Sequence, residues 1–161
     1  MLPSAQAISA PRYVPPSTIA PDLGLPPAEP DPNPIAWLGP VEHEHHILVL
    51  GGPGPELMCA LLRAGASHVT HLRAHERPEA DSASLVIVPR IPSLDWLAAV
   101  LPAIRRALTA RGRLVLYTGG QAVTQIQIRR MLTLLGMTAI RAHATEDGQV
   151  LSAERPARRF A

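Results

Sequence analysis

Residues 47–64 read ILVLGGPGPELMCALLRA, and this stretch decides the fold class of the 161-residue chain. The four apolar residues at 47–50 predict a buried strand, the glycines and prolines after them predict a tight turn, and residues 56–64 predict a helix. Pro55 suits the first helical position, and Glu56 is favoured at the positive end of a helix. A buried strand that turns on glycine into a helix is the typical first unit of an α/β domain.

The same alternation of strand and helix continues towards the C-terminus. We predict strands over 68–73, 85–88 and 113–118, helices over 94–110 and 121–135, and a hairpin of 137–144 with 149–154. Pro102 is expected to kink its helix or to begin a second helical piece. Short, continuously apolar strands are typical of a mostly parallel sheet covered on both faces. The sequence therefore predicts one α/β domain over residues 41–156, followed by a basic tail at 157–161.

Residues 1–40 have a different composition, with eleven of the 18 prolines and a single basic residue, Arg12. Proline fixes φ and removes a hydrogen-bond donor, so we expect this proline-rich segment to be extended or irregular. Two interpretations stay open: a disordered leader, or an arm that lays apolar side chains on its own domain or on a partner. Those side chains are Tyr13, Val14, Ile19, Leu23, Leu25, Ile35, Trp37 and Leu38.

Composition excludes several classes of protein. The chain contains no lysine, which removes Schiff-base chemistry, a lysine general base and the phosphate-binding P-loop. A single cysteine, Cys59, excludes an internal disulfide framework and suits a reducing compartment, so we expect a cytoplasmic protein, with Cys59 as a buried, inert thiol. No apolar run approaches the ~20 residues of a membrane helix, so no membrane insertion is expected. A net charge of +2, with the arginines spread along the folded part apart from Arg155, Arg158 and Arg159 at the end, does not favour nucleic acid as a partner.

The seven histidines are the remaining candidates for chemistry. His43 and His45 would share a strand face if the first strand extended upstream, which makes a metal site conceivable, but solvated histidines are the simpler interpretation. The sequence HEHH at 43–46 lacks the HExxH spacing of zinc peptidases. No Ser/His/Asp arrangement or pair of carboxylates is recognisable, and Asp95 is interpreted as a stabiliser of a helix start. We therefore predict no catalytic residue and no metal site.

Two further stretches carry a resemblance to a known family. Residues 101–118 read LPAIRRALTARGRLVLYT, and residues 128–156 read as a helix ending in LLGM followed by a hairpin ending in VLSAERP. In this order, they resemble the class I S-adenosylmethionine-dependent methyltransferase fold over about residues 47–156. The resemblance implies a three-layer, Rossmann-like, mostly parallel sheet with a C-terminal β-hairpin. If the fold retains its ancestral ligand, the implied cofactor is S-adenosylmethionine.

The glycine turn is a first point of comparison with that family. Gly51, Gly52 and Gly54 match its glycine-rich first motif, which lets backbone approach a bound ligand. The acidic residue expected near the end of the preceding strand is absent, and Leu48 and Leu50 occupy that neighbourhood. A tight connection between strand and helix, without any ligand, remains the alternative interpretation of this turn.

Two arginines are a second point of departure. The family ends its second strand with a carboxylate that accepts both ribose hydroxyls, whereas this chain has Arg73 there, and Arg90 follows the strand at 85–88 where an acidic or polar residue is common. Two guanidinium groups beside a pocket for a cationic sulfonium disfavour that ligand. They are either solvated loop residues or part of an anion site, together with the N–H groups after Gly54.

Length is the third departure, because only 11 residues separate Arg73 from Leu85. The family inserts a helix, an edge strand and another helix there, so the fold is expected to be shortened and to lack the wall of the adenine pocket. We therefore predict a degenerate, non-catalytic methyltransferase-like domain without a cofactor, acting as an interaction or structural subunit. Its arm would engage a protein partner or a second copy. The alternatives are a small active methyltransferase completed by a partner chain, and an anion- or nucleotide-binding module.

Overall fold

The computed structural model describes Leu38 and residues 46–52, 54–73, 75–119, 122–145 and 148–157. The chain divides into two units, Met1–Asp31 and Pro32–Ala161, and all of the described residues belong to the second. Apart from Leu38, the apolar side chains assigned to the arm lie outside the described residues. The interpretation of the arm therefore stays a prediction.

Within the described residues, the chain forms six strands and three helices. They are β1 (His46–Leu50), α1 (Gly54–Arg63), β2 (His68–Leu72), β3 (Ala83–Val88), α2 (Leu94–Ala107), β4 (Leu108–Gly119), α3 (Ala122–Leu134), β5 (Thr138–Thr145) and β6 (Gly148–Glu154). Strands and helices alternate except where β3 follows β2 directly and where β5 and β6 form the C-terminal hairpin. The strand order is β2-β1-β3-β4-β6-β5, and β6 runs antiparallel to both of its neighbours while the other pairings are parallel. The predicted mostly parallel sheet with a C-terminal hairpin is confirmed.

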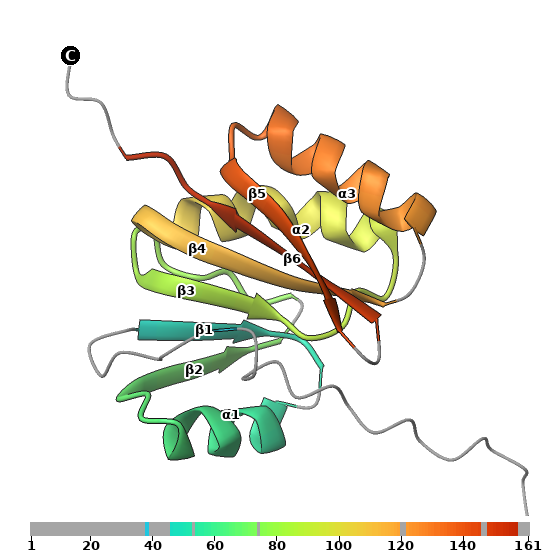
Figure 1. Cartoon of the computed structure of the whole chain (residues 1–161). Coiled ribbons are helices and arrows are strands. Elements are labelled where there is room, and N and C mark those ends of the chain that lie inside the picture. The colour runs from blue at the N-terminus through green and yellow to red at the C-terminus, as the bar shows by residue number, and fades with distance from the viewer. Residues whose placement is uncertain are drawn as a thin grey trace, which may run out of the picture. The chain divides into compact units, whose positions relative to one another are not determined.

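The sheet forms the middle of three layers. Figure 1 shows α1 on one side of the sheet and α2 and α3 on the other. On the side of α1, Leu57 and Leu61 pack with Ile47, and on the opposite side Leu101 and Ile128 belong to the larger buried cluster. The connection from β1 leads to β2, whereas the connection from β3 leads away from it to β4, so the chain switches direction between β1 and β3. Ligands of open α/β sheets bind at such a switch point.

The boundary between α2 and β4 differs from the prediction. The helix ends at Ala107, where residues 94–110 were predicted to be helical, and it passes through Pro102 as one element. Leu108 already has extended backbone, with φ −63° and ψ 135°, and pairs with Ala83 of β3. The prediction was wrong because pairing with β3 begins before Arg111, whose φ of 64° marks the irregular start of β4.

Leu38 is part of the core of the domain. Its side chain is 1% exposed and lies in the cluster on the α1 side of the sheet, together with Val115 and Val150. Its carbonyl oxygen accepts a hydrogen bond of 2.7 Å from Nη2 of Arg113 in β4. One side chain of the predicted arm therefore packs on its own domain.

Arg155 joins the end of β6 to two other parts of the domain. Its Nη1 donates to Oδ1 of Asp81 at 2.6 Å and to the carbonyl oxygen of Leu108, and its backbone N–H donates to the carbonyl oxygen of Gly112 at 2.8 Å. The backbone N–H of Arg111 donates in turn to the carbonyl oxygen of Arg155 at 3.0 Å. These bonds hold the loop before β3, the start of β4 and the end of β6 together.

In the part of the chain that the structure describes, no helix is long and apolar enough to cross a membrane.

Candidate functional site

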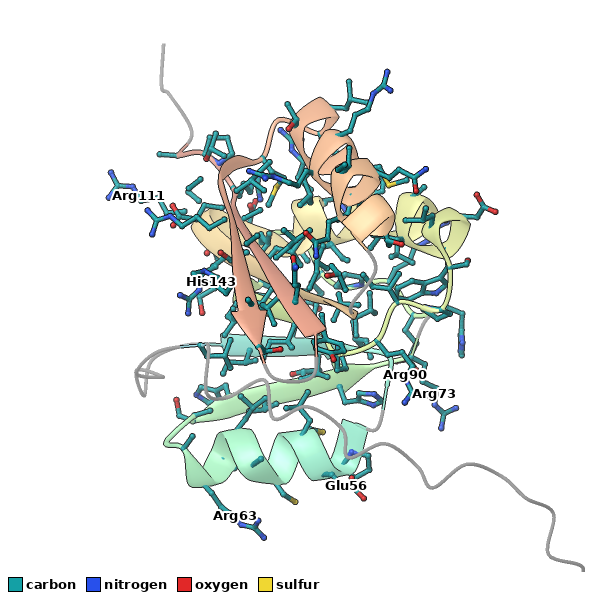
Figure 2. All side chains as sticks on the ribbon, turned by 45° about the vertical axis from the view of Figure 1, so that its right-hand side comes forward. Glu56, Arg63, Arg73, Arg90, Arg111 and His143 are labelled. Atoms are coloured by element: carbon teal, nitrogen blue, oxygen red, sulfur yellow. The ribbon has the colours of Figure 1, made fainter. Side chains whose placement is uncertain are left out.

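The predicted site residues lie at the carboxyl ends of three neighbouring strands. Gly51 and Gly52 follow β1, Arg73 follows β2, and Arg90 lies two residues after β3. These strands are parallel neighbours in the order β2-β1-β3, so their carboxyl ends lie at the same edge, at the switch point. Figure 2 shows Arg73 and Arg90 at one end of the sheet and Arg111 at the opposite end. The structure therefore brings the glycine turn and the two arginines to one edge.

The turn between β1 and α1 depends on glycine for its backbone conformation. Gly51 and Gly52 have φ angles of +70° and +69°, in the left-handed region that other residues rarely adopt. The backbone N–H of Gly54 donates to the carbonyl oxygen of Gly52 at 2.9 Å, which folds the turn back, and that of Gly51 donates to the carbonyl oxygen of Leu72 at 3.1 Å. The turn is thus fixed both internally and to β2.

Two of the three glycines are in close contact with neighbouring side chains, one from β2 and one from the residue after β3. A Cβ atom added at Gly52 would lie 2.5 Å from Cγ of Pro89, and one added at Gly54 would lie 2.5 Å from the ring of His71. A Cβ at Gly51 would meet nothing within 4 Å. The room left by Gly52 and Gly54 is therefore occupied by the protein itself, while Gly51 faces open space.

His71 belongs to this edge although the sequence interpretation treated it as a solvated histidine. Its side chain is half-buried against Gly54, and its Nε2 atom is buried without a hydrogen-bond partner in the described part of the chain. The solvated interpretation was wrong for this residue. Strand alternation contains the missing signal, because His71 must share a face with Val69, which packs in the cluster with α1.

Arg73 is exposed and begins a tight turn after β2. Its backbone N–H donates to Oε2 of Glu76 at 2.9 Å, and its carbonyl oxygen accepts from the backbone N–H of Glu76 at 3.0 Å. Figure 2 shows the Arg73 side chain extending outward. Glu76 thus brings a carboxylate to this edge, which sequence reasoning missed because it sought an acidic residue at the end of the strand itself. That carboxylate already accepts a bond from backbone.

The end of β1 offers no acidic group. Leu48 and Leu50 are 4% and 3% exposed and belong to the cluster beneath α2 and α3. On the other side of the turn, Arg90 is exposed and follows Pro89, the residue that contacts Gly52. Among the described residues, the switch point therefore has Arg73 with Glu76 on one flank, Arg90 on the other, and apolar side chains at its base.

His46, at the opposite end of β1, is hydrogen-bonded to β2 and to the residue before β3. His46 Nδ1 lies 2.6 Å from the carbonyl oxygen of Ser82, and its Nε2 lies 3.2 Å from Oγ1 of Thr70. Its ring meets that of His68 edge to face, with 6.2 Å between centroids. Both nitrogens of His46 are engaged, and no group of three or more His, Cys, Asp or Glu residues in the described ranges could hold a metal ion. His43 and His45 lie outside those ranges.

Cys59 differs from its predicted environment. It was expected to be buried, but it is exposed on α1. The helix turns Leu57 and Leu61 towards the sheet, and a residue midway between them points to the outer side.

At the start of α2, Ser93 is the N-cap, with Oγ accepting from the backbone N–H of Trp96, and Asp95 lies in the first turn as predicted.

Comparison with known proteins identifies the fold. No family model matches the chain, and no curated protein matches it. Among solved structures, an S-adenosylmethionine-dependent O-methyltransferase from Thermotoga maritima aligns with a TM-score of 0.59 and 13% identity over 79% of this chain and 65% of its own. The S-adenosylmethionine-dependent methyltransferase SibL in its apo form gives 0.60 and 16% over 78% and 55%. A third methyltransferase of this kind, from Methanosarcina mazei, gives 0.57 and 11% over 78% and 98%.

These likenesses concern the fold alone, because the sequence identities are low. The chain has a class I methyltransferase-like fold, as the resemblance of its sequence implied. It spans between 55% and 66% of the length of the first three solved structures, although it covers nearly all of the Methanosarcina protein. The fold therefore does not decide whether this chain binds the same ligand.

Proposed function

We propose that this chain is a non-catalytic, methyltransferase-like domain that works as an interaction or structural subunit. The observation that carries the proposal is Arg73, which follows β2 directly, at the position where the family resemblance places the carboxylate for the ribose. A guanidinium has five N–H donors and no acceptor, so it cannot accept hydrogen bonds from two adjacent hydroxyls. Its charge also repels the sulfonium of S-adenosylmethionine.

The contacts of the glycine turn support the same proposal. In a nucleotide-binding turn, the missing side chains let ligand and backbone approach each other closely. Here Pro89 and His71 occupy that room at Gly52 and Gly54. The glycines therefore serve internal packing, which is sufficient reason for their presence. The residues at these strand ends therefore do not fit S-adenosylmethionine.

The proposed partner is a protein, engaged through the proline-rich arm at residues 1–40. Its support is compositional, since an extended, proline-rich segment loses little conformational entropy when it binds along a surface. Affinity purification with the full chain and with a variant lacking residues 1–31 tests this part. The deletion leaves Leu38 in place. We expect a partner protein other than a second copy of this chain to be recovered with the full chain and lost with the variant, and equal recovery of that protein by both would contradict the proposal.

Isothermal titration of the full chain with S-adenosylmethionine and with S-adenosylhomocysteine tests the absence of cofactor binding. We expect no heat of binding at ligand concentrations up to about 1 mM, because Arg73 supplies no acceptor for the ribose. A dissociation constant in the micromolar range would overturn the proposal. If such binding were lost in Glu76→Gln, Glu76 would be the ribose acceptor and the chain would be a candidate enzyme.

Two alternative functions remain, and each has its own experimental test. A small active methyltransferase completed by a partner chain predicts transfer of a labelled methyl group in the presence of that partner. An anion- or nucleotide-binding module is favoured by the two arginines that flank the turn. It predicts thermal stabilisation by nucleotide phosphates that is lost in Arg73→Ala and Arg90→Ala. Stabilisation that persists in both variants would argue against an arginine-lined site.

A further inference from the structure

Within the described residues, the outer edge of β2 carries backbone groups without a hydrogen-bond partner. β2 is the first strand in the order β2-β1-β3-β4-β6-β5, and β1 is its one partner within the described residues. The N–H and C=O of a strand residue point to the same edge, and successive residues point to opposite edges. The carbonyl oxygen of Leu72 accepts from Gly51, so Leu72, Thr70 and His68 face β1. Val69 and His71 therefore direct their backbone groups outward.

The carboxyl end of this edge is closed by a turn. Arg73 is the next outward-facing residue, and both of its backbone groups are bonded to Glu76. Four backbone groups thus remain on the edge, the N–H and C=O of Val69 and of His71. No residue in the described part of the chain pairs with them. An unpaired row of this kind is a template for a further strand.

The two edges of the sheet differ in how they are protected. β5, at the opposite edge, contains Ala139 with a φ of 52°, a break in its pairing with β6 and the charged Arg141. Bulges and charged side chains are the usual devices that keep sheet edges apart. β2 has the sequence HVTHL, without proline, bulge, Asp, Glu, Lys or Arg. It is therefore the unprotected edge.

We infer that β2 pairs with β2 of a second copy of this chain, antiparallel about a two-fold axis at Thr70. In this arrangement Val69 of each protomer lies opposite His71 of the other. Each of these two pairs exchanges two N–H···O=C bonds, so all four backbone groups of both protomers are satisfied. The two Thr70 residues face each other as a non-hydrogen-bonded pair, with Cα atoms about 4.5 Å apart, and facing threonines stabilise strand pairs.

A second copy fits this edge better than a longer foreign strand. The open stretch offers only two outward residues before the turn at Arg73, so additional residues of a longer strand would gain no backbone bonds. A second β2 has the same length, ends in the same turn and has no charged residue that would face its like. α1 packs against β2 and carries Leu62, which is 49% exposed, so apolar surface is present on the adjoining helix. This inference is independent of cofactor binding and of the arm.

Disulfide trapping tests the two-fold axis directly. Cα atoms about 4.5 Å apart are within the range that a disulfide spans. In the full chain with Cys59→Ser, which removes the exposed native thiol, Thr70→Cys should form a covalent dimer under mild oxidation. The matched control is His143→Cys with Cys59→Ser, an exposed position on β5 at the other edge. Equal cross-linking of both variants, or none with Thr70→Cys, would overturn the inference.

Solution mass gives an independent measurement. By light scattering coupled to size exclusion at about 100 μM, the wild-type chain should have twice the monomer mass. Val69→Pro removes one outward N–H without removing a bond to β1, so it should yield a monomer with an unchanged circular dichroism spectrum, whereas Val69→Thr should remain dimeric. A monomeric wild type, or a dimer unaffected by Val69→Pro, would refute pairing at β2. If Val69→Pro does not fold, the cross-linking of Thr70→Cys compared with His143→Cys decides whether β2 pairs with β2. Neither outcome bears on titration with S-adenosylmethionine.

Discussion

At the residue scale, Gly52 and Gly54 of the turn after β1 are in close contact with the side chains of Pro89 and His71. Gly54 lies in α1, where alanine would normally favour the helix, yet the His71 ring lies where a Cβ would be. We expect Gly54→Ala to lower the free energy of unfolding by about 1–3 kcal/mol, the usual cost of forcing extra volume into a packed site. Urea denaturation measures the change.

His71→Ala provides the control for that substitution. It removes the ring that the new Cβ would strike, so the cost of Gly54→Ala should fall well below its value in the wild-type background. The comparison is a double-mutant cycle, which isolates the interaction between the two positions. If Gly54→Ala costs the same with and without the ring, the contact with His71 is not the reason for glycine at this position.

Leu38 provides a second residue-scale prediction, because it is buried although it lies in the segment predicted as an arm. Leu38→Ala should lower the free energy of unfolding by about 2–5 kcal/mol, the range for leucine truncation in cores. Leu62→Ala is the matched control, since Leu62 is 49% exposed where Leu38 is 1% exposed, and it should cost much less. Equal costs in chemical denaturation would show that Leu38 does not pack on the sheet in solution.

The local sequence predicted where these residues lie along the chain but not which distant residues they contact. The glycine turn and the positions of Arg73 and Arg90 after their strands follow from the order of apolar runs and turn residues, which are close in sequence. The contacts of Pro89 with Gly52 and of His71 with Gly54 depend on which strands become neighbours. The burial of Leu38 likewise depends on residues about 75 positions away, such as Arg113. No local pattern contains that information.

At the element scale, the sequence predicted the succession of strands and helices but not every boundary. Short apolar runs bounded by turn residues predicted the succession from β1 through α1 and β2 to β3, and also the final hairpin. All of these elements are present. The end of α2 was misplaced because Leu108 and Ala110 are strong helix formers, so local propensity extends the predicted helix beyond Ala107. Pairing of Leu108 with Ala83 decides their conformation, and this is a contact between distant elements.

Arg155 ties three of these elements together and supports an element-scale prediction. Its side chain is 14% exposed, and its guanidinium donates to Asp81 and to backbone carbonyl oxygens at the junction of α2 and β4. Hydrogen bonds that involve a charged group contribute about 1.5–3 kcal/mol each, so Arg155→Met should lower the free energy of unfolding by at least about 2 kcal/mol.

Two comparisons separate the contributions within that cluster. Asp81 is 42% exposed, and a surface ion pair is worth little, so Asp81→Asn should cost less than Arg155→Met in the same urea experiment. Arg130→Met, at an exposed position on α3, should change stability by less than about 0.5 kcal/mol. If Asp81→Asn and Arg155→Met cost the same, the ion pair rather than the carbonyl bonds holds the junction.

At the scale of the whole molecule, shortening the connection between β2 and β3 has two consequences that belong together. The loop of residues 73–82 contains neither strand nor helix among its described residues, so β2 becomes the edge of the sheet. The switch point loses the neighbouring elements that the family places beside its nucleotide, and the same loss uncovers the backbone of Val69 and His71. In our two proposals, one change in chain length therefore both disfavours S-adenosylmethionine and creates a surface for association.

This link predicts that folding stability depends on protein concentration. If two folded chains pair through β2, the native state is favoured by mass action, and a hundredfold increase in concentration adds about 2.7 kcal/mol per dimer. For a dimer of domains of this size, we expect the melting temperature to rise by roughly 5 °C over that range. Differential scanning calorimetry from low to high micromolar concentration measures the shift, and Val69→Pro, as the monomeric control, should melt at one temperature throughout. A wild-type melting temperature that is equally constant would mean that the open edge of β2 stays unpaired in solution.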